Sequence, residues 1–168
     1  MKKIKIAITG PESCGKTTLA VQLSAALNEP FSSEYARTFL VNLDRKYRQS
    51  DLDLIAKAQI ENQQKAIENC RKYAIFDTDL SVIKIWSDVV YGDCSDFINT
   101  NFEANFADLY LLCAPDMPWE ADPLRENPTN RDELFEKYEQ LLKDYQLPYV
   151  VIAGNQKQRL ETVLEILK

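Results

Sequence analysis

Residues 10–17 have the types and spacing of a loop that binds phosphate. They fit the pattern G-x-x-x-x-G-K-[ST] at every fixed position and follow an alternating apolar stretch at residues 4–8. Successive backbone N–H groups in such a loop point inward and bind anions. The helix that follows adds the positive end of its dipole. We therefore expect the phosphates of a nucleotide to lie in this loop.

Side chains within the loop have separate expected roles. Lys16 supplies a positive charge to the β- and γ-phosphates, and the Thr17 hydroxyl is placed to hold Mg²⁺. Gly10 and Gly15 allow the backbone to turn where a Cβ atom would clash. Glu12 is expected to point away from the loop, because a carboxylate beside phosphates would repel them.

Two carboxylates follow a short apolar segment, Ala74-Ile75-Phe76. Asp77 stands where a carboxylate that manages Mg²⁺ is expected. Asp79 lies two residues further on, and if the strand continued, its side chain would lie on the same face of the sheet as that of Asp77. The alternative is that one or both cap the next helix, which suits Asp79 before Leu80 well. We predict that Asp77 is linked to the metal and that Asp79 either meets substrate hydroxyls or caps the helix.

A third carboxylate, Glu34, follows a short strand-like piece at residues 31–33. Ligands of open α/β sheets bind at the carboxyl ends of the strands, so Glu34 would face the same crevice as the phosphate loop. It could accept a proton from an attacking hydroxyl, as kinases use an aspartate. The alternative is an ordinary carboxylate in the first turn of a surface helix.

Residues 115–130 form a long irregular stretch that holds four of the seven prolines. Long ordered loops often act as lids. Arg125 lies in this stretch and Arg131 directly after it. An arginine on a lid can stabilise charge on a phosphoryl group in transfer, whereas the alternative is a solvated loop charge. We predict that at least one of Arg125 and Arg131 stabilises the phosphoryl group. Asp116, between two prolines, is interpreted as part of the loop.

The order of elements predicts an α/β fold with a mainly parallel sheet in a single domain over residues 1–168. We expect Ser50 with Asp53, and Asn130 with Glu133, to begin two of the helices as capping pairs. The expected strands are 3–9, 31–33, 74–76, 109–113 and 149–153. The expected helices are 16–28, 35–44, 50–72, 80–90, one after residue 130 and a last one around 160–167.

Composition limits the classes of function. The 168 residues are 45 % hydrophobic and carry a net charge of −6, which favours a folded domain over a basic nucleic-acid-binding surface. No apolar run is long enough to cross a membrane and no secretion signal is recognisable, so we expect a cytoplasmic protein. The four cysteines lack metal-ligand spacing and are expected to be reduced. Because there is no histidine, acid–base chemistry falls to carboxylates, lysine or tyrosine.

Four ordered segments carry a narrower resemblance: GPESCGKTTLA, EYAR, FDTD and PWEADPLRENPTNR. Together they resemble the NadR-like P-loop ATPases, a family that includes a nicotinamide-riboside kinase domain. The resemblance implies a kinase-type P-loop NTPase fold with a five-stranded sheet, ATP with Mg²⁺ and a closing lid around Arg125. The loop residues that it implies bind the nucleotide are Gly10, Ser13, Cys14, Gly15, Lys16, Thr17 and Thr18.

The same resemblance implies a small nucleoside-like acceptor, with nicotinamide riboside as the leading candidate. Glu34 and Asp79 would serve it beside Asp77, in a chain that stands alone as a kinase-like unit. One departure is Ser33, where the nicotinamide-riboside enzymes usually have an aromatic residue. The aromatic side chains expected to contact the acceptor instead are those of Tyr35, Trp86 and Tyr91.

Other functions stay open at this point. The chain could be a kinase for a different nucleoside or small metabolite, or a switch that binds and slowly hydrolyses ATP. Asn155, in the loop after the last predicted strand, could lie near the adenine. A GTPase is disfavoured because the N-K-x-D signature of guanine recognition is not evident. The oligomeric state is left open.

Overall fold

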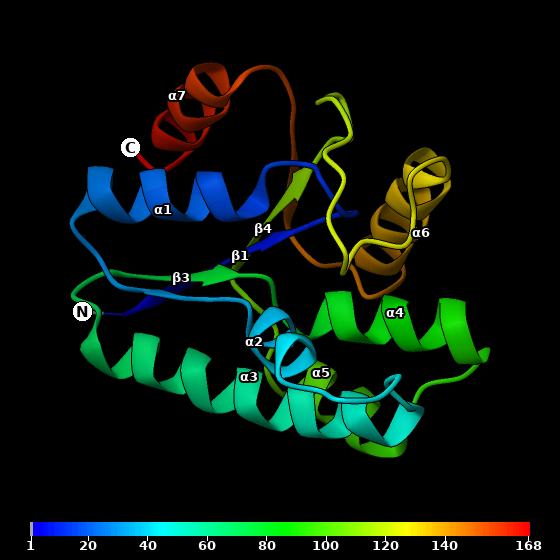
Figure 1. The fold of residues 1–168 in the computed structure, drawn as a ribbon. Helices are drawn as coiled ribbons and strands as arrows, with labels where there is room; N and C mark the ends of the chain where they lie inside the picture. The colour runs from blue at the N-terminus through cyan, green and yellow to red at the C-terminus, as the bar shows by residue number, and fades with distance from the viewer. Residues whose placement is uncertain (1) are drawn as a thin grey trace.

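A five-stranded parallel sheet runs through the middle of the residues that the structure, a computed structural model, describes: 2–168 (Figure 1). The strand order is β2-β3-β1-β4-β5. All neighbouring strands are parallel, as the sequence predicts. The strands are β1 (Ile4–Thr9), β2 (Phe31–Ser32), β3 (Tyr73–Asp77), β4 (Leu109–Cys113) and β5 (Tyr149–Ile152).

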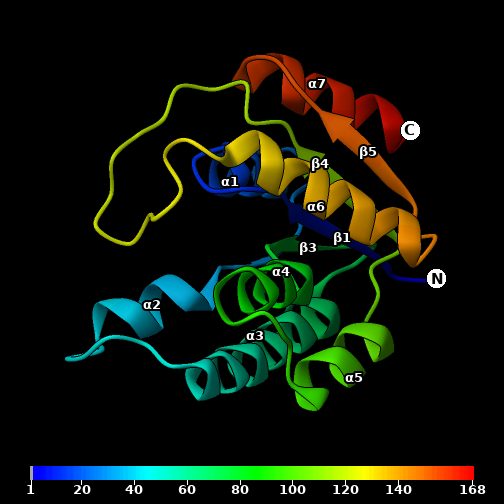
Figure 2. The same cartoon turned by 90° about the vertical axis from the view of Figure 1, so that its right-hand side faces the viewer.

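Helices cover both faces of this sheet (Figure 2). One face is covered by α1 and α7, and the other by α3, α4 and α6, as the two separate sets of core residues confirm. The central strands are apolar on both sides for this reason, as expected of parallel strands between helices. The helices are α1 (Lys16–Leu27), α2 (Tyr35–Val41), α3 (Gln49–Asn69), α4 (Leu80–Tyr91), α5 (Asp96–Ala104), α6 (Arg131–Asp144) and α7 (Gln156–Ile166).

The parallel register brings the loops that carry chemistry to one edge of the sheet. Ile8 of β1 pairs with Asp77 of β3, and Thr9 pairs with Leu112 of β4. The phosphate loop after β1 and the Asp77 carboxylate after β3 therefore leave the sheet side by side. The segment after β4 begins at the same edge and runs through residues 114–130, a described stretch that forms no helix or strand.

Two predicted capping pairs are wrong. The helix expected from Ser50 begins at Gln49, because the Arg48 backbone N–H donates to the Asp51 carboxylate at 2.7 Å and closes the first turn there. Asn130 precedes α6, but its amide donates to the Asn127 side chain at 3.1 Å instead of accepting from the helix.

One helix, α5, was not predicted. It begins after Ser95, whose hydroxyl accepts the Ile98 N–H at 3.2 Å. A serine before a short apolar repeat is the signal that could have revealed it. The helix packs Ile98 and Phe102 into the core and lies beside α3 and α4.

The cysteines are as expected: within residues 2–168, all four are free thiols, and three of them are buried. None of the helices in the described part of the chain combines the length and the hydropathy needed to cross a bilayer.

Candidate nucleotide and acceptor site

The phosphate loop after β1 has the backbone of an anion-binding nest. Gly10 and Gly15 have φ of 130° and 79°, and Ser13 between them also has a positive φ, 53°. A Cβ atom on Gly10 would lie 2.8 Å from the Cys113 carbonyl oxygen, a backbone atom that cannot move aside cheaply. Glycine is thus required there both by its conformation and by the close approach of β4.

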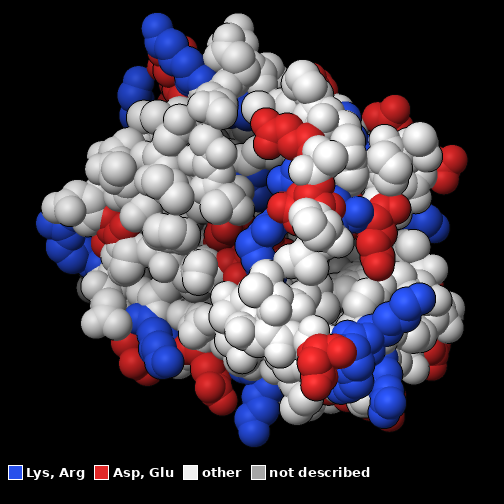
Figure 3. All heavy atoms as spheres, viewed as in Figure 1, with Lys and Arg blue, Asp and Glu red and all other residues white. Residues whose placement is uncertain are grey.

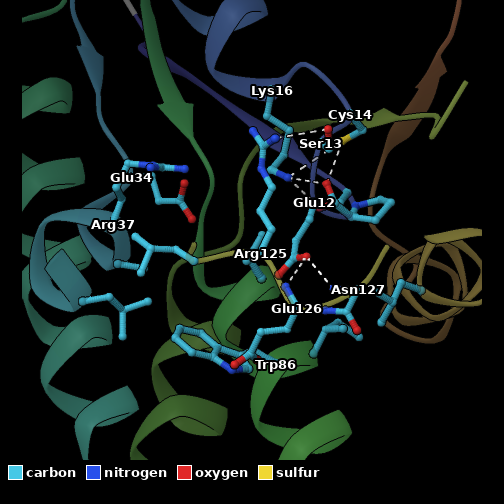
Figure 4. A pocket seen from close by; sticks show the side chains of 18 of the residues that line it. Glu12, Ser13, Cys14, Lys16, Glu34, Arg37, Trp86, Arg125, Glu126 and Asn127 are labelled. Atoms are coloured by element: carbon cyan, nitrogen blue, oxygen red, sulfur yellow. Dashed lines mark hydrogen bonds between the residues drawn. The ribbon is translucent and has the colours of Figure 1, made fainter. Parts of the chain in front are cut away.

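Lys16 opens α1 and turns its side chain back over this loop (Figure 4). Its ammonium donates to the Gly10 carbonyl at 2.9 Å and to the Pro11 carbonyl at 2.5 Å. Burial opposes the charge, but the neighbouring Cys14 and Glu34 raise the pKa of Lys16 above its ordinary value. The lysine is therefore a cation at neutral pH, in reach of any anion held by the loop.

Asp77 and Thr17 meet at the end of β3, where the sequence places a metal site. Asp77 is 1 % exposed, and its Oδ1 atom has no hydrogen-bond partner within residues 2–168. Burial raises the pKa of Asp77, while the Thr17 hydroxyl and Lys16 lower it less. An unpaired buried carboxylate oxygen beside a threonine hydroxyl is a donor set that fits Mg²⁺.

Glu34 ends the short connection after β2 and lines the same cavity as the phosphate loop. Burial raises the pKa of its carboxyl, Lys16 lowers it, and Asp77 raises it again, with a net increase. Its backbone N–H also stabilises the Asp77 carboxylate. The predicted grouping of Glu34, Asp77 and Lys16 at one edge of the sheet is thus what the structure has.

A cavity of about 750 Å³ extends from the phosphate loop to a wall with aromatic side chains. This is the size of a small-molecule site. Lys16, Glu34 and Arg125 lie at the phosphate-loop end, and the aromatic wall consists of Tyr47, Trp86 and Tyr91. Acidic and basic side chains are mixed across the surface on the face seen in Figure 3.

The proline-rich stretch 115–130 lies over the phosphate loop and contacts it through Ser13. The Ser13 hydroxyl accepts the Glu120 backbone N–H at 3.0 Å and an Arg125 N–H at 3.3 Å. The Ser13 carbonyl accepts from Arg131 at 2.9 Å. Both guanidinium groups lie over the Trp119 ring, at 6.0 and 5.8 Å from its centroid. Both candidate arginines are therefore at the phosphate loop.

Four residues predicted for the site are not among the described residues that line the cavity. One of them, Asp77, still meets the lining residue Thr17 at the end of β3, whereas the other three lie elsewhere. Asp79 is buried as the N-cap of α4, where its carboxylate accepts the Ser81 N–H at 3.1 Å. Tyr35 packs against Phe39 at the side of the core. Asn155 caps α7 by accepting the Gln158 N–H at 3.0 Å.

Two residues at the site were missed by sequence reasoning. Tyr47, in the connection between α2 and α3, contacts Trp86 edge to face with 4.9 Å between the ring centroids. The available signal was an aromatic residue among the charged residues 44–48 of this loop. Arg159 on α7 is 1 % exposed and donates to the Cys14 carbonyl at 2.8 Å. No signal in the sequence separates it from a surface arginine.

Comparisons with known proteins show the family of this chain and the proteins that share its fold. The family described as AAA domain, AAA_28, matches residues 5–159. The trifunctional NAD biosynthesis/regulator protein NadR of Salmonella typhimurium is 29 % identical over 124 residues, 71 % of this chain and 30 % of NadR. The Escherichia coli NadR is 26 % identical over 151 residues, 86 % of this chain and 37 % of NadR. The chain thus spans about a third of the length of these relatives.

Solved structures share the fold of P-loop kinases with this chain. NadR in complex with NR has a TM-score of 0.79 at 20 % identity, covering 98 % of this chain and 50 % of NadR. Deoxyadenosine kinase from M. mycoides has a TM-score of 0.69 at 20 % identity, with 98 % of both chains covered. Thymidylate kinase from Ehrlichia chaffeensis has a TM-score of 0.72 at 15 % identity, with 100 % of both chains covered. The NadR-like resemblance is confirmed, and by its match over residues 5–159 the chain belongs to the AAA_28 family of AAA-domain proteins.

Proposed function

We propose that this protein is a kinase that transfers the γ-phosphoryl group of ATP, with Mg²⁺, to a hydroxyl of a small nucleoside-like acceptor. The observation that carries the proposal is the single cavity that joins the phosphate loop to the aromatic wall, with Glu34 lining it. A protein that only hydrolyses ATP needs room for a water molecule beside the phosphates, and not a cavity that extends from there to an aromatic wall.

Each side chain at the phosphate end has a role in this reaction. Lys16 and Arg125 stabilise the negative charge that develops on the oxygens of the phosphoryl group. Thr17 and Asp77 hold Mg²⁺, which when bound neutralises phosphate charge and orients the phosphates. Thr17 is the first residue after Lys16 on α1, and its hydroxyl hydrogen-bonds the Asp77 carboxylate.

Glu34 is the group proposed to act on the acceptor. Its carboxylate accepts the hydrogen bond of the acceptor hydroxyl, which directs the oxygen lone pair toward the phosphoryl group. As the O–P bond forms, the hydroxyl proton passes to the Glu34 carboxylate and the bond to the ADP oxygen breaks. Burial raises the pKa of Glu34, and the Lys16 cation nearby opposes that increase and so favours the proton-accepting form.

Nicotinamide riboside is the leading acceptor. The support is the similarity to NadR, one structure of which contains NR, and the aromatic wall of Tyr47, Trp86 and Tyr91, which suits a cationic ring. The similarity to deoxyadenosine kinase supports another nucleoside as the second candidate. The further activities of the longer NadR proteins lie outside this proposal.

The test is a screen of acceptors. Purified protein with ATP and Mg²⁺ is incubated with nicotinamide riboside, adenosine, deoxyadenosine, cytidine, uridine or thymidine, and phosphorylated products are detected by mass spectrometry. ADP release is followed in parallel without acceptor. We expect one nucleoside to be phosphorylated well above this background. ATP hydrolysis that no acceptor changes would replace the kinase with an ATP-dependent switch.

A further inference from the structure

Glu12, at the third position of the phosphate loop, points out of the loop toward the proline-rich stretch (Figure 4). Its Oε2 atom accepts the backbone N–H groups of Glu126 and Asn127, both at 3.0 Å. A carboxylate next to a phosphate site is unfavourable unless it has another partner. These two N–H groups are that partner, and they belong to residues directly after Arg125.

The side chain of Glu126 continues in the opposite direction, to the aromatic wall. Its carboxylate accepts the Tyr47 hydroxyl at 2.9 Å, and the Tyr47 oxygen accepts the Trp86 indole N–H at 3.2 Å. Four residues earlier in the same stretch, Asp122 forms an ion pair with Arg37 of α2 at 2.9 Å. The proline-rich stretch is therefore attached to the phosphate loop on one side and to the aromatic wall on the other.

We infer that Glu12 and Glu126 are positioning residues that hold residues 120–127 as a lid in one closed position, with Arg125 directed at the phosphate loop. This inference rests on the proposed function. It adds a coupling between the phosphate-loop end and the aromatic wall of the cavity. A single lid residue, Glu126, contacts the phosphate loop through its backbone and the aromatic wall through its side chain.

The physical argument concerns how an arginine on an irregular segment is kept in place. Within residues 2–168, the Arg125 guanidinium donates hydrogen bonds only to the Ser13 hydroxyl of the phosphate loop and the Glu120 carbonyl of the lid, and it lies over the Trp119 ring. Without Glu12, the adjoining N–H groups lose a charged acceptor, and hydrogen bonds to charged groups are the stronger kind. The segment then opens more often, and a displaced catalytic charge loses much of its effect.

Amide exchange tests the closed position without any substrate. The exchange rates of the Glu126 and Asn127 N–H groups are measured by NMR in wild type, Glu12→Ala and Glu12→Gln. We expect about tenfold faster exchange in Glu12→Ala and a smaller change in Glu12→Gln, whose amide oxygen still accepts. Glu136→Ala, an exposed carboxylate change on α6, is the control and should match wild type. Unchanged exchange in Glu12→Ala would overturn the inference.

The acceptor side has its own variant. Tyr47→Phe keeps the ring against Trp86 but removes the hydroxyl that donates to Glu126. Faster exchange at the Glu126 N–H in this variant is the expected sign that the wall holds the lid. If exchange responds to Glu12→Ala but not to Tyr47→Phe, the coupling between the phosphate-loop end and the aromatic wall is refuted and only the anchor on the loop stands.

Kinetics then show whether the position of the lid matters for turnover. Glu12→Ala should lower kcat about tenfold with the KM for ATP changed less than threefold, and Glu12→Gln should recover part of it. The double variant of Glu12→Ala and Arg125→Ala should have the same kcat as Arg125→Ala alone, because both changes act through the Arg125 guanidinium. If the two losses in kcat were additive, Glu12 would not act through Arg125. If exchange changes as expected while no acceptor is ever phosphorylated, the lid anchor stands and the kinase proposal fails.

Discussion

The guanidinium of Arg159 donates to the carbonyl oxygen of Cys14 at 2.8 Å, across 145 positions of the sequence. The same side chain donates to the Gly154 carbonyl at 2.7 Å and the Ala114 carbonyl at 3.0 Å, and it pairs with Asp116. One buried arginine on α7 thus joins the phosphate loop, the beginning of the segment after β4 and the loop after β5. The predicted loop residue Asp116 has its partner here.

Arg159→Lys should destabilise the protein by about 3 kcal/mol, because one ammonium cannot reach acceptors that a planar guanidinium binds in several directions. The Asp116 side chain is 38 % exposed, so water can solvate part of what is lost. Urea unfolding at pH 7 measures the change. Lys157→Met, at an exposed position of the same helix, is the control. A change below 0.5 kcal/mol, roughly the size of a surface substitution, would show that Arg159 does not hold the loops together.

Lys16→Ala should leave a folded protein with ATP turnover reduced by two to three orders of magnitude, on the order of the loss of one preorganised charge. The fold is expected to survive because, within residues 2–168, the ammonium hydrogen-bonds only groups of the phosphate loop itself, the Gly10 and Pro11 carbonyls and the Cys14 sulfur. Turnover and circular dichroism are measured on the same preparation. Activity within threefold of wild type in a folded variant would remove Lys16 from the reaction.

Asp77→Asn should have opposite effects on stability and on the metal. Burial raises the pKa of Asp77 and one of its oxygens is unpaired, so a neutral amide of the same shape should fit without loss of stability. The Mg²⁺ concentration for half-maximal activity at fixed ATP should rise about tenfold or more. An unchanged midpoint for Mg²⁺ would mean that the metal is held without Asp77.

The central architecture could be predicted from the sequence because its signals are local. Each strand is an apolar run between polar turns, and β4 was predicted with its observed ends, Leu109 and Cys113. The phosphate loop is likewise a continuous pattern in which every fixed residue follows the last. The position of Asp77 at the end of a strand was predicted because it follows an apolar run, and a strand end lies at the carboxyl edge of any parallel sheet.

Contacts between distant segments could not be predicted in this way. Glu12 was expected to point away from the phosphates, but its partners in the lid lie 114 and 115 positions further along the chain. Asp79 and Tyr35 lie next to correctly placed residues, yet they point elsewhere. Asp79 satisfies the start of α4, which was the alternative that its position before Leu80 had suggested.

Asp51 should make stability depend on pH in a defined window. Arg45 lowers the pKa of its carboxyl to about 2, against the opposing effect of burial and with the help of the Arg48 N–H. The ordinary pKa is 3.8, so the ionised Asp51 carboxylate stabilises the fold fully above about pH 5. This stabilisation is lost as the pH falls toward 2. Because Arg45 is 40 % exposed, we expect about 1–2 kcal/mol and not the full value of the shift.

The measurement for Asp51 is urea unfolding of wild type and Asp51→Asn at pH 7, 5 and 3. The free-energy difference should be equal at pH 7 and 5 and smaller at pH 3, where the unfolded carboxyl is largely protonated. A difference that stays constant down to pH 3 would mean that the Arg45 pair contributes little. Arg45 lies in the connection that carries Tyr47, so the acceptor KM should rise in this variant as well.

Trp86 offers the sharpest test of where the acceptor binds. It lines the cavity on α4, and its indole N–H donates to the Tyr47 hydroxyl at 3.2 Å. Stacking of a base on an aromatic side chain contributes roughly 1–3 kcal/mol, which corresponds to about a 5- to 150-fold change in affinity. Because a flat ring binds the acceptor equally before and during the reaction, its loss should raise KM and leave kcat almost unchanged.

We therefore expect Trp86→Ala to raise the acceptor KM within that range, and Trp86→Phe to raise it much less, because the flat face remains. The KM for ATP should stay within twofold in both variants, and Phe97→Ala, at an exposed aromatic on α5, should change neither constant. Initial rates with acceptor and ATP varied in turn provide all of these values. A lower kcat with an unchanged acceptor KM, or an equal effect on the KM for ATP, would show that the aromatic wall does not bind the acceptor.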